Sequence, residues 1–384
     1  MSADFIVSSA CNSLLRNTES DIDTNLNMTR FGQNNMDGAN SGMIERALSE
    51  AFPNREPRRL SAVGPSWNGA NETVGVGFAD GGRAFLKVAV TDESNRLARE
   101  RAVLRYVGAH GQLPVPEVLA ADPDGDPAYL ATAPAPGRGL LDVYDAASDD
   151  ERERLLRRVG AALAALHADR FASHGEIVGA GRERGSAAEG EATPDPDGPT
   201  GLAIEFASWT DVLLATIERT REIGTSERLA DHYDAVVDCV CANRDLLDGA
   251  PAALLHGDVT KPNLFVTAEG DGADATDGPG VAAIDWELSH VGDPARDLVR
   301  AEDQLLNGFD STGPERFASA LRDGYRERAG GLPKGFERRR PIYEAVRMLG
   351  RSGFIDQWVP YLDEPLDDLV ERADAELRAR LNAV

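Results

Sequence analysis

The spacing of apolar residues along the chain changes from an extended to a helical pattern near residue 134. Before that point, short runs rich in β-branched residues are separated by turn residues such as Asp80-Gly81-Gly82, a pattern typical of hairpins. A helix at 94–107 interrupts them, with Leu97, Leu104 and Val107 on one face. The strands predicted are 73–79, 84–90, 115–120 and 128–132. The pattern therefore predicts a small antiparallel sheet with one inserted helix.

Beyond the Pro- and Gly-containing stretch 134–137 the apolar residues recur at helical spacing. Residues 151–167 carry leucines along one side and predict an amphipathic helix. Further helices are predicted from 228 to 247, from 298 to 384, and where Phe206, Trp209, Leu213 and Ile217 share a face. The stretch 179–201, rich in Gly, Pro, Ala and acids, is predicted to be a surface loop. The fold class is α+β, a small sheet lobe followed by a larger helical lobe.

The first 42 residues contain few apolar side chains and no sustained periodicity, so they are predicted to be a disordered tail. The first predicted helix runs from 43 to 52. We expect an N-terminal lobe at 43–133 and a helical C-terminal lobe at 134–384.

The chain is strongly acidic: 384 residues include 40 Lys and Arg against 65 Asp and Glu, a formal net charge of -25. Such a field repels nucleic acid phosphates and anionic membranes, so neither is an expected partner. Only three basic residues are lysine: Lys87, Lys261 and Lys334. A lysine-poor acidic surface suggests a halophilic protein, because about 1 M salt shortens the screening length to roughly 3 Å. A merely acidic, GC-biased chain is the alternative.

The three cysteines, Cys11, Cys239 and Cys241, form neither a disulfide framework nor a zinc-binding pattern. We therefore expect a reducing, cytoplasmic location. No apolar run has the roughly 18 residues of a membrane-spanning helix. The oligomeric state cannot be read from the sequence.

Two short motifs carry the candidate chemistry. The first is His256-Gly257-Asp258-Val259-Thr260-Lys261-Pro262-Asn263, and the second is Ile284-Asp285-Trp286-Glu287. Phosphoryl transfer depends on positioning, on cations and on a carboxylate that orients the attacking hydroxyl, a role that suits Asp258. Asn263 and Asp285 offer the oxygen ligands that Mg2+ prefers. Each motif borders an apolar run, and the predicted hairpin between them brings Asn263 close to Asp285.

Lysine and histidine positions add to this pattern. Lys87 is the single charge in the run 84–90, where it either extends to solvent or grips nucleotide phosphates. The scarcity of lysine favours the second interpretation, and Glu100 of the next helix could hold Lys87 in place. Lys261 lies either near the transferred phosphate or in solvent. Because the histidines show no zinc spacing, His256 is interpreted as an anchor of the loop. The sequence contains no Walker-type phosphate loop.

With these residues placed, the chain resembles the aminoglycoside phosphotransferase and choline kinase-like family, which shares the protein kinase fold. The resemblance implies Asp258 as catalytic base, Asn263 and Asp285 as Mg2+ ligands, and ATP as phosphoryl donor. It also implies Lys87 as the phosphate-binding lysine and Glu100 as its partner on the helix.

The same resemblance places a nucleotide-covering turn at 66–71, so Asn68 and Asn71 are candidate nucleotide-binding residues. Lys261 of the first motif is a third candidate. It places the adenine-binding hinge at 134–137, and it implies that the segment Gly292-Asp293-Pro294 with Asp297 supports the loop structure. The covering turn lacks the glycine richness of protein kinases. The acidic insertions at 185–200 and 269–280 have no counterpart in the family pattern.

The hypothesis is an ATP- and Mg2+-dependent kinase that phosphorylates a hydroxyl group of a small molecule. A protein Ser/Thr kinase is one alternative, although Gly257 stands where those enzymes commonly have Arg. A catalytically inactive nucleotide-binding module is another, although the proposed ligands are all present. The acceptor cannot be identified from the sequence.

Overall fold

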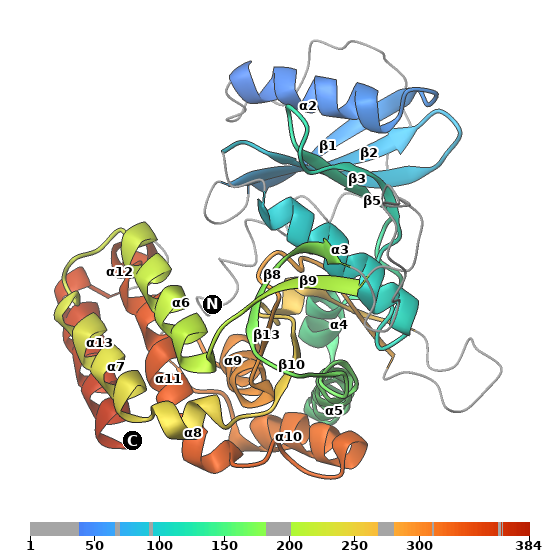
Figure 1. Ribbon diagram of the computed structural model, residues 1–384. Helices are drawn as coiled ribbons and strands as arrows, with labels where there is room; N and C mark the ends of the chain where they lie inside the picture. Colours follow the sequence, from blue (N-terminus) through green and yellow to red (C-terminus); the bar gives the residue numbers. More distant parts are fainter. Residues whose placement is uncertain are drawn as a thin grey trace, which may run out of the picture.

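The computed structural model describes residues 38–65, 70–91, 95–181, 201–267, 280–308, 311–359, 362 and 364–384. The chain forms two lobes, with the N-terminal lobe above the larger C-terminal lobe in Figure 1. Residues 1–37 of the predicted tail, residue Asn68 and most of the two acidic insertions lie outside the described residues.

The N-terminal lobe is a five-stranded antiparallel sheet in the order β1-β2-β3-β5-β4. Its strands are β1 (Pro57–Pro65), β2 (Asn71–Phe78), β3 (Arg83–Ala89), β4 (Val118–Asp122) and β5 (Tyr129–Thr132). This confirms the predicted sheet, and β1 is an additional strand that the periodicity did not single out.

Two helices cover this sheet, one on each side: α2 (Gly38–Ala51) and α3 (Asn95–His110). Apolar residues of α2 pack with Ala84, Leu86 and Val88 of β3 in one core cluster. Because side chains alternate along a strand, Lys87 points to the opposite face, toward α3. Helix α2 begins at Gly38, five residues before the predicted start, so residues 38–42 do not belong to a tail.

The C-terminal lobe is largely helical. Its helices are α4 (Leu140–Ala146), α5 (Asp149–Leu166), α6 (Trp209–Ile223), α7 (Asp231–Ala242), α8 (Arg244–Asp248), α9 (Pro294–Leu306), α10 (Glu315–Ala329), α11 (Phe336–Ser352), α12 (Ile355–Trp358) and α13 (Leu366–Asn382). The helix predicted at 228–247 is divided into α7 and α8, since the chain leaves helical geometry at Asn243. No described helix is both long and apolar enough to cross a membrane.

Two small sheets lie in this lobe. One has the order β7-β10-β13-β8-β9, with β7 (Arg170–Phe171), β10 (Ala252–Leu255), β13 (His290–Gly292), β8 (Gly175–Gly181) and β9 (Gly201–Phe206). The other has the order β12-β11-β6, with β12 (Val281–Ala283), β11 (Leu264–Val266) and β6 (Arg138–Gly139). The pairing of β11 with β12 confirms the hairpin predicted between the two motifs.

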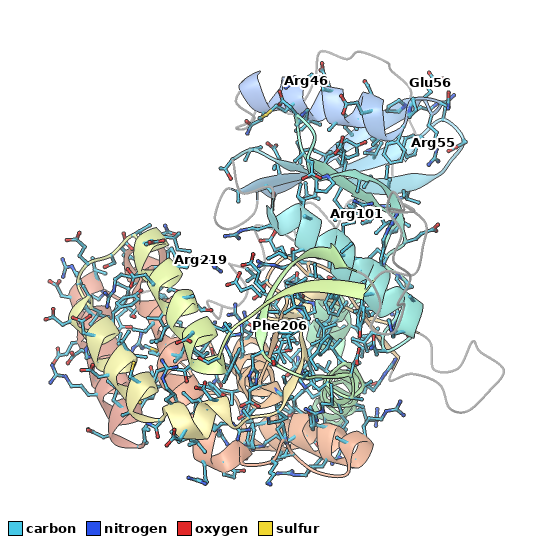
Figure 2. The ribbon with its side chains drawn as sticks, viewed as in Figure 1. Arg46, Arg55, Glu56, Arg101, Phe206 and Arg219 are labelled. Carbon is cyan, nitrogen blue, oxygen red and sulfur yellow. The ribbon has the colours of Figure 1, made fainter. Side chains whose placement is uncertain are left out.

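The prediction for residues 179–206 was partly wrong. The ends of the predicted loop belong to β8 and β9, which pair as an antiparallel ribbon. Phe206, labelled in Figure 2, does not share the buried face of a helix. It ends β9 and is 63% exposed. Helix α6 begins at Trp209, whose side chain is fully buried together with Leu213.

Candidate active site

Lys87 lies where the two lobes meet. Its Nζ is 2.7 Å from Glu100 Oε2 on α3, 2.7 Å from Asp285 Oδ1 after β12, and 3.4 Å from Glu287 Oε2. Burial disfavours the charged lysine, but Asp285, Glu100 and Glu287 outweigh it and hold the pKa of Lys87 well above its usual value. The ion pair expected with Glu100 is confirmed.

The three carboxylates around Lys87 crowd one another. Their nearest oxygens all lie within 4.8 Å. Burial raises the pKa of Glu100 to about 7; Lys87 opposes this rise, while Asp285 and Glu287 add to it. Asn71 Nδ2 donates to Glu287 Oε2 at 2.9 Å, so Asn71 contacts this acidic cluster directly.

Asp285 has an unusual backbone. With φ of 65° it is the one non-glycine residue in the described part of the chain with positive φ. Such a conformation costs free energy and is concentrated at functional sites. Ile284 N–H donates to Asn263 O at 3.0 Å, so the two predicted metal-binding residues lie on adjoining backbone.

The loop after β10 carries Asp258. Asp297 of α9 is fully buried and accepts hydrogen bonds from His256 N–H at 2.9 Å and Gly257 N–H at 3.0 Å. Gly257 has φ of 82°, and a Cβ there would lie 2.3 Å from Leu288 O. Glycine is therefore required at the position where the backbone turns toward Asp258.

His256 connects the two motifs. Its Nε2 is 3.0 Å from Ile284 O, and its Nδ1 accepts from Asp258 N–H at 3.2 Å. Burial lowers the pKa of His256, which keeps the ring neutral with one donating and one accepting nitrogen. These bonds agree with its interpretation as an anchor.

Three polar contacts hold the Asp258 carboxylate, and a fourth reaches its backbone carbonyl. Oδ1 accepts from Gln304 Nε2 at 2.8 Å and from Arg300 Nη2 at 3.0 Å. Asn263 Nδ2 donates to Oδ2 and to the Asp258 carbonyl, both at 3.1 Å. Burial alone would raise the pKa of Asp258, but Arg300 and Gln304 hold it below its ordinary value. Asp258 is therefore ionised at neutral pH and able to accept a hydrogen bond.

The donor set suits Mg2+. Asp285 offers a carboxylate, and Asn263 directs its amide nitrogen to Asp258, which leaves its amide oxygen for another partner. Hard oxygen ligands in small number are what Mg2+ prefers. Glu100 and Glu287 add negative charge nearby.

The remaining predicted residue, Lys261, lies in the short 3-10 helix η1 (Lys261–Asn263). Its Nζ is 4.7 Å from the centre of the Tyr144 ring. Lys261 thus shares this short helix with Asn263 and follows closely on the loop that carries Asp258.

Sequence reasoning missed several residues of the site. Glu287 belongs to the second motif, and its spacing of two from Asp285 could have indicated it. Arg300 and Gln304 lie four residues apart on α9 and reach Asp258 only through tertiary packing, so no local pattern signals them. Arg99 bonds Glu287 O at 3.1 Å and Ile177 O at 2.7 Å, which ties α3 to the C-terminal lobe.

A lysine on the third strand of an N-terminal sheet, paired with a helix glutamate and set against two polar motifs of a helical lobe, defines the protein kinase-like fold class. Residues 63–342 match the model of the phosphotransferase enzyme family. Because that match covers well over half of the chain, the protein belongs to this family of small-molecule kinases. No curated protein matches the chain.

Solved structures share the fold. A protein described as a fructosamine-3-kinase of Thermobifida fusca has 21% identity and a TM-score of 0.52, with 89% of this chain and 100% of that chain covered. The GDP and kanamycin complex of an APH(2'') enzyme gives 11% identity and a TM-score of 0.53, covering 88% and 97%. The streptomycin and ATP complex of APH(2'')-IIa gives 15% and 0.51, covering 90% and 97%.

Proposed function

We propose that the chain is an ATP- and Mg2+-dependent kinase that transfers the γ-phosphoryl group to a hydroxyl of a small molecule. The observation that carries this proposal is the assembly of Lys87, Asp285, Asn263 and Asp258 from separate segments into one connected network. Family membership supports a small-molecule acceptor over a protein, and the solved relatives with ATP or GDP support a nucleotide donor.

In the proposed reaction the acceptor oxygen forms a bond to the γ-phosphorus, the bond from that phosphorus to the β-phosphate bridging oxygen breaks, and ADP leaves. Asp258 accepts the hydrogen bond of the acceptor hydroxyl and takes its proton. Arg300 and Gln304 keep Asp258 oriented and ionised. Lys87 compensates the charge of the phosphates. Lys261 adds positive charge beside the loop.

Asn263 and Asp285 are the residues that would hold Mg2+. When bound, the ion neutralises the negative charge that develops on the phosphate oxygens. Asn71 supports the site through Glu287. Asn68, which lies outside the described residues, is proposed to contact the nucleotide.

The test is ADP release by the wild type and by Asp258→Asn, with ATP or GTP, Mg2+ and a panel of hydroxyl acceptors. We expect acceptor-dependent ADP release to fall by about 10²–10⁴ in the variant, as for the loss of a general base. ATP binding, measured by calorimetry, should be retained because Asp258 lies apart from Lys87. Full turnover by Asp258→Asn with a true acceptor contradicts the assigned role, and no Mg2+-dependent nucleotide binding by the wild type contradicts the function.

A further inference from the structure

A basic pocket lies next to Asp258. It is formed between α6, α9 and α11, which are neighbours in the C-terminal lobe (Figure 1). It is a small cavity of about 50 Å³ that opens to solvent, and its lining includes Thr216, Arg296, Arg300, Tyr343 and Arg347. Arg300 also donates to Asp258, so the pocket adjoins the candidate catalytic base.

The charge of this pocket is opposite to that of the chain. The chain has 65 acidic and 40 basic residues, yet three arginines and no acidic residue are among the described residues that line the pocket. The basic lining of the pocket therefore does not follow from the overall composition of the chain. A positive pocket in a negative protein selects anions locally.

Arg296 is a buried cation with little local compensation. It is 7% exposed, its Nη1 contacts the neutral ring of His290 at 2.9 Å, and its guanidinium lies over Trp209 at 5.9 Å. No carboxylate of the described residues lies within 4.0 Å of it. Burial, and then repulsion by Arg300, lower the pKa of Arg296 to about 10, although attraction by Asp297 opposes the shift. Burying an unpaired charge is costly, so an anion entering the pocket relieves this cost.

The other two arginines have shared partners. Arg347 Nε is 2.9 Å from Asp303, but Asp303 also pairs with Arg351 at 2.8 Å. Arg300 divides its bonds between Asp258 and Gln304. The cluster formed by Arg296, Arg300 and Arg347 thus has more positive charge than Asp258 and Asp303 neutralise, because Asp303 also serves Arg351.

We propose that this pocket binds the phosphoryl acceptor and that the acceptor carries an oxyanion, a carboxylate or a phosphate ester, held by Arg296 and Arg347. This inference rests on the proposed function. Guanidinium groups match both oxyanions in a bidentate geometry. The acceptor is accordingly an anionic hydroxy compound rather than a polycation.

The spacing along α9 indicates the size of the acceptor. Arg296, Arg300 and Gln304 are four residues apart and lie on one face, and the last two hold Asp258. Four residues of an α-helix advance roughly 6 Å along its axis. Because Arg296 and Arg300 extend from successive turns of one helix face, we expect the oxyanion and the reacting hydroxyl to belong to one small molecule, such as a hydroxy acid or a sugar phosphate.

The first experiment measures binding without any transfer. Inorganic phosphate and malonate are titrated calorimetrically at constant ionic strength into the wild type, Arg296→Gln and Arg338→Gln. Arg338 is an exposed residue of α11 outside the pocket, so its variant matches the change in charge. We expect Arg296→Gln to weaken binding at least tenfold and Arg338→Gln to leave it unchanged.

The probe that binds more tightly identifies the oxyanion as phosphate or carboxylate. No binding, or equal binding by the two variants, overturns the proposal. If Arg296→Gln does not fold, Arg296→Lys takes its place, with an expected loss of at least threefold because a lysine cannot bind in the bidentate manner.

The second experiment measures ADP release with matched acceptors: D-gluconate against D-glucitol, D-glucose 6-phosphate against D-glucose, and kanamycin as a polycation. We expect kcat/KM to be at least tenfold higher for the anionic member of a pair that is turned over. Higher kcat/KM with glucitol, glucose or kanamycin overturns the inference and leaves the kinase proposal intact. Absence of turnover with every acceptor bears on the kinase proposal, while the binding experiment still decides the pocket.

Discussion

At the scale of single residues, the site is a set of charges that offset one another. Lys87 is surrounded by Glu100, Asp285 and Glu287, whereas Arg300 and Gln304 hold the Asp258 carboxylate. The pKa of Glu100 is raised to about 7, while that of Asp258 is lowered. The group that titrates near neutral pH is therefore the lysine's partner and not the proposed base.

This difference predicts the pH dependence of kcat/KM. Glu100 is ionised above pH 7 and pairs with Lys87, and it becomes protonated as the pH falls below 7, which weakens the pair. We expect kcat/KM to fall about tenfold from pH 8 to pH 6, because the ionised fraction of a group with a pKa of about 7 falls about tenfold over this range. The measurement is the pH profile of the free enzyme at low acceptor concentration.

Glu100→Gln is the matched variant. It should be slower at pH 8 and show no decrease between pH 8 and pH 6, because the titrating group is gone. A profile that keeps its acid limb near pH 7 in Glu100→Gln contradicts this assignment.

At the scale of elements, the loop after β10 is fixed by contacts at both ends. Gly257 turns the backbone beneath Leu288 O, and Asp297 at the start of α9 holds two of its N–H groups. The position of Asp258 therefore depends on backbone geometry as well as on its own side chain.

Gly257→Ala is expected to lower activity as well as stability. Positive φ costs an L-residue about 1 kcal/mol, and the contact of 2.3 Å with Leu288 O must also be relieved by moving the loop. Gly330→Ala is the control, since Gly330 has φ of 77° with nothing within 4 Å of a Cβ. Both should lower the urea midpoint, and only Gly257→Ala should lower kcat, by tenfold or more. Equal kcat in the two variants contradicts the argument.

Asp297→Asn tests the support beneath the loop. His167 and the backbone N–H groups hold the pKa of Asp297 far below its usual range despite burial, so its contribution is present above the unfolded pKa near 4 and is lost only in strong acid. We expect the variant to lose about 2–4 kcal/mol in the free energy of unfolding, as for a broken buried network. Urea unfolding should give the same loss at pH 6 and pH 8, and a loss that changes between them indicates another group.

The sequence predicted elements well where a local pattern decided the structure. The hairpin between the motifs and the helix α5 follow from periodicity, and Lys87 stood out because a lone charge interrupts an apolar strand. The ribbon of β8 and β9 could not be predicted in this way. Its glycines and its long connection resemble a loop, and the two strands pack against α3, a contact that no local pattern signals. The same limit applies to Arg300, whose role depends on where α9 lies.

At the scale of the whole molecule, net charge is the dominant property. A formal charge of -25 repels itself, and ion pairs such as those of Arg316 or Arg322 offset it only locally. Whether the protein is adapted to high salt remains a prediction from composition.

We expect the thermal midpoint to rise when KCl is increased from 0.1 to 2 M, because the screening length falls from about 10 Å to below roughly 3 Å. A gain of about 1 kcal/mol corresponds to roughly 2–4 °C for a chain of this size or somewhat smaller. KCl is preferred to sulfate, which also strengthens apolar burial. A midpoint that stays constant or falls favours the alternative of a merely acidic chain.

Helix α3 belongs to the N-terminal lobe by sequence, but most of its contacts with sheet strands are with the C-terminal lobe. It packs against β8, and Arg99 bonds backbone carbonyls of both β8 and the second motif (Figure 1). Its contacts with β4 and β5 are fewer. Because of these contacts, we expect α3 to stay with the C-terminal lobe in any movement that separates the two lobes, and Glu100 then to move away from Lys87. The distance between Lys87 Nζ and Glu100 Oε2 is therefore expected to increase with the separation of the two lobes.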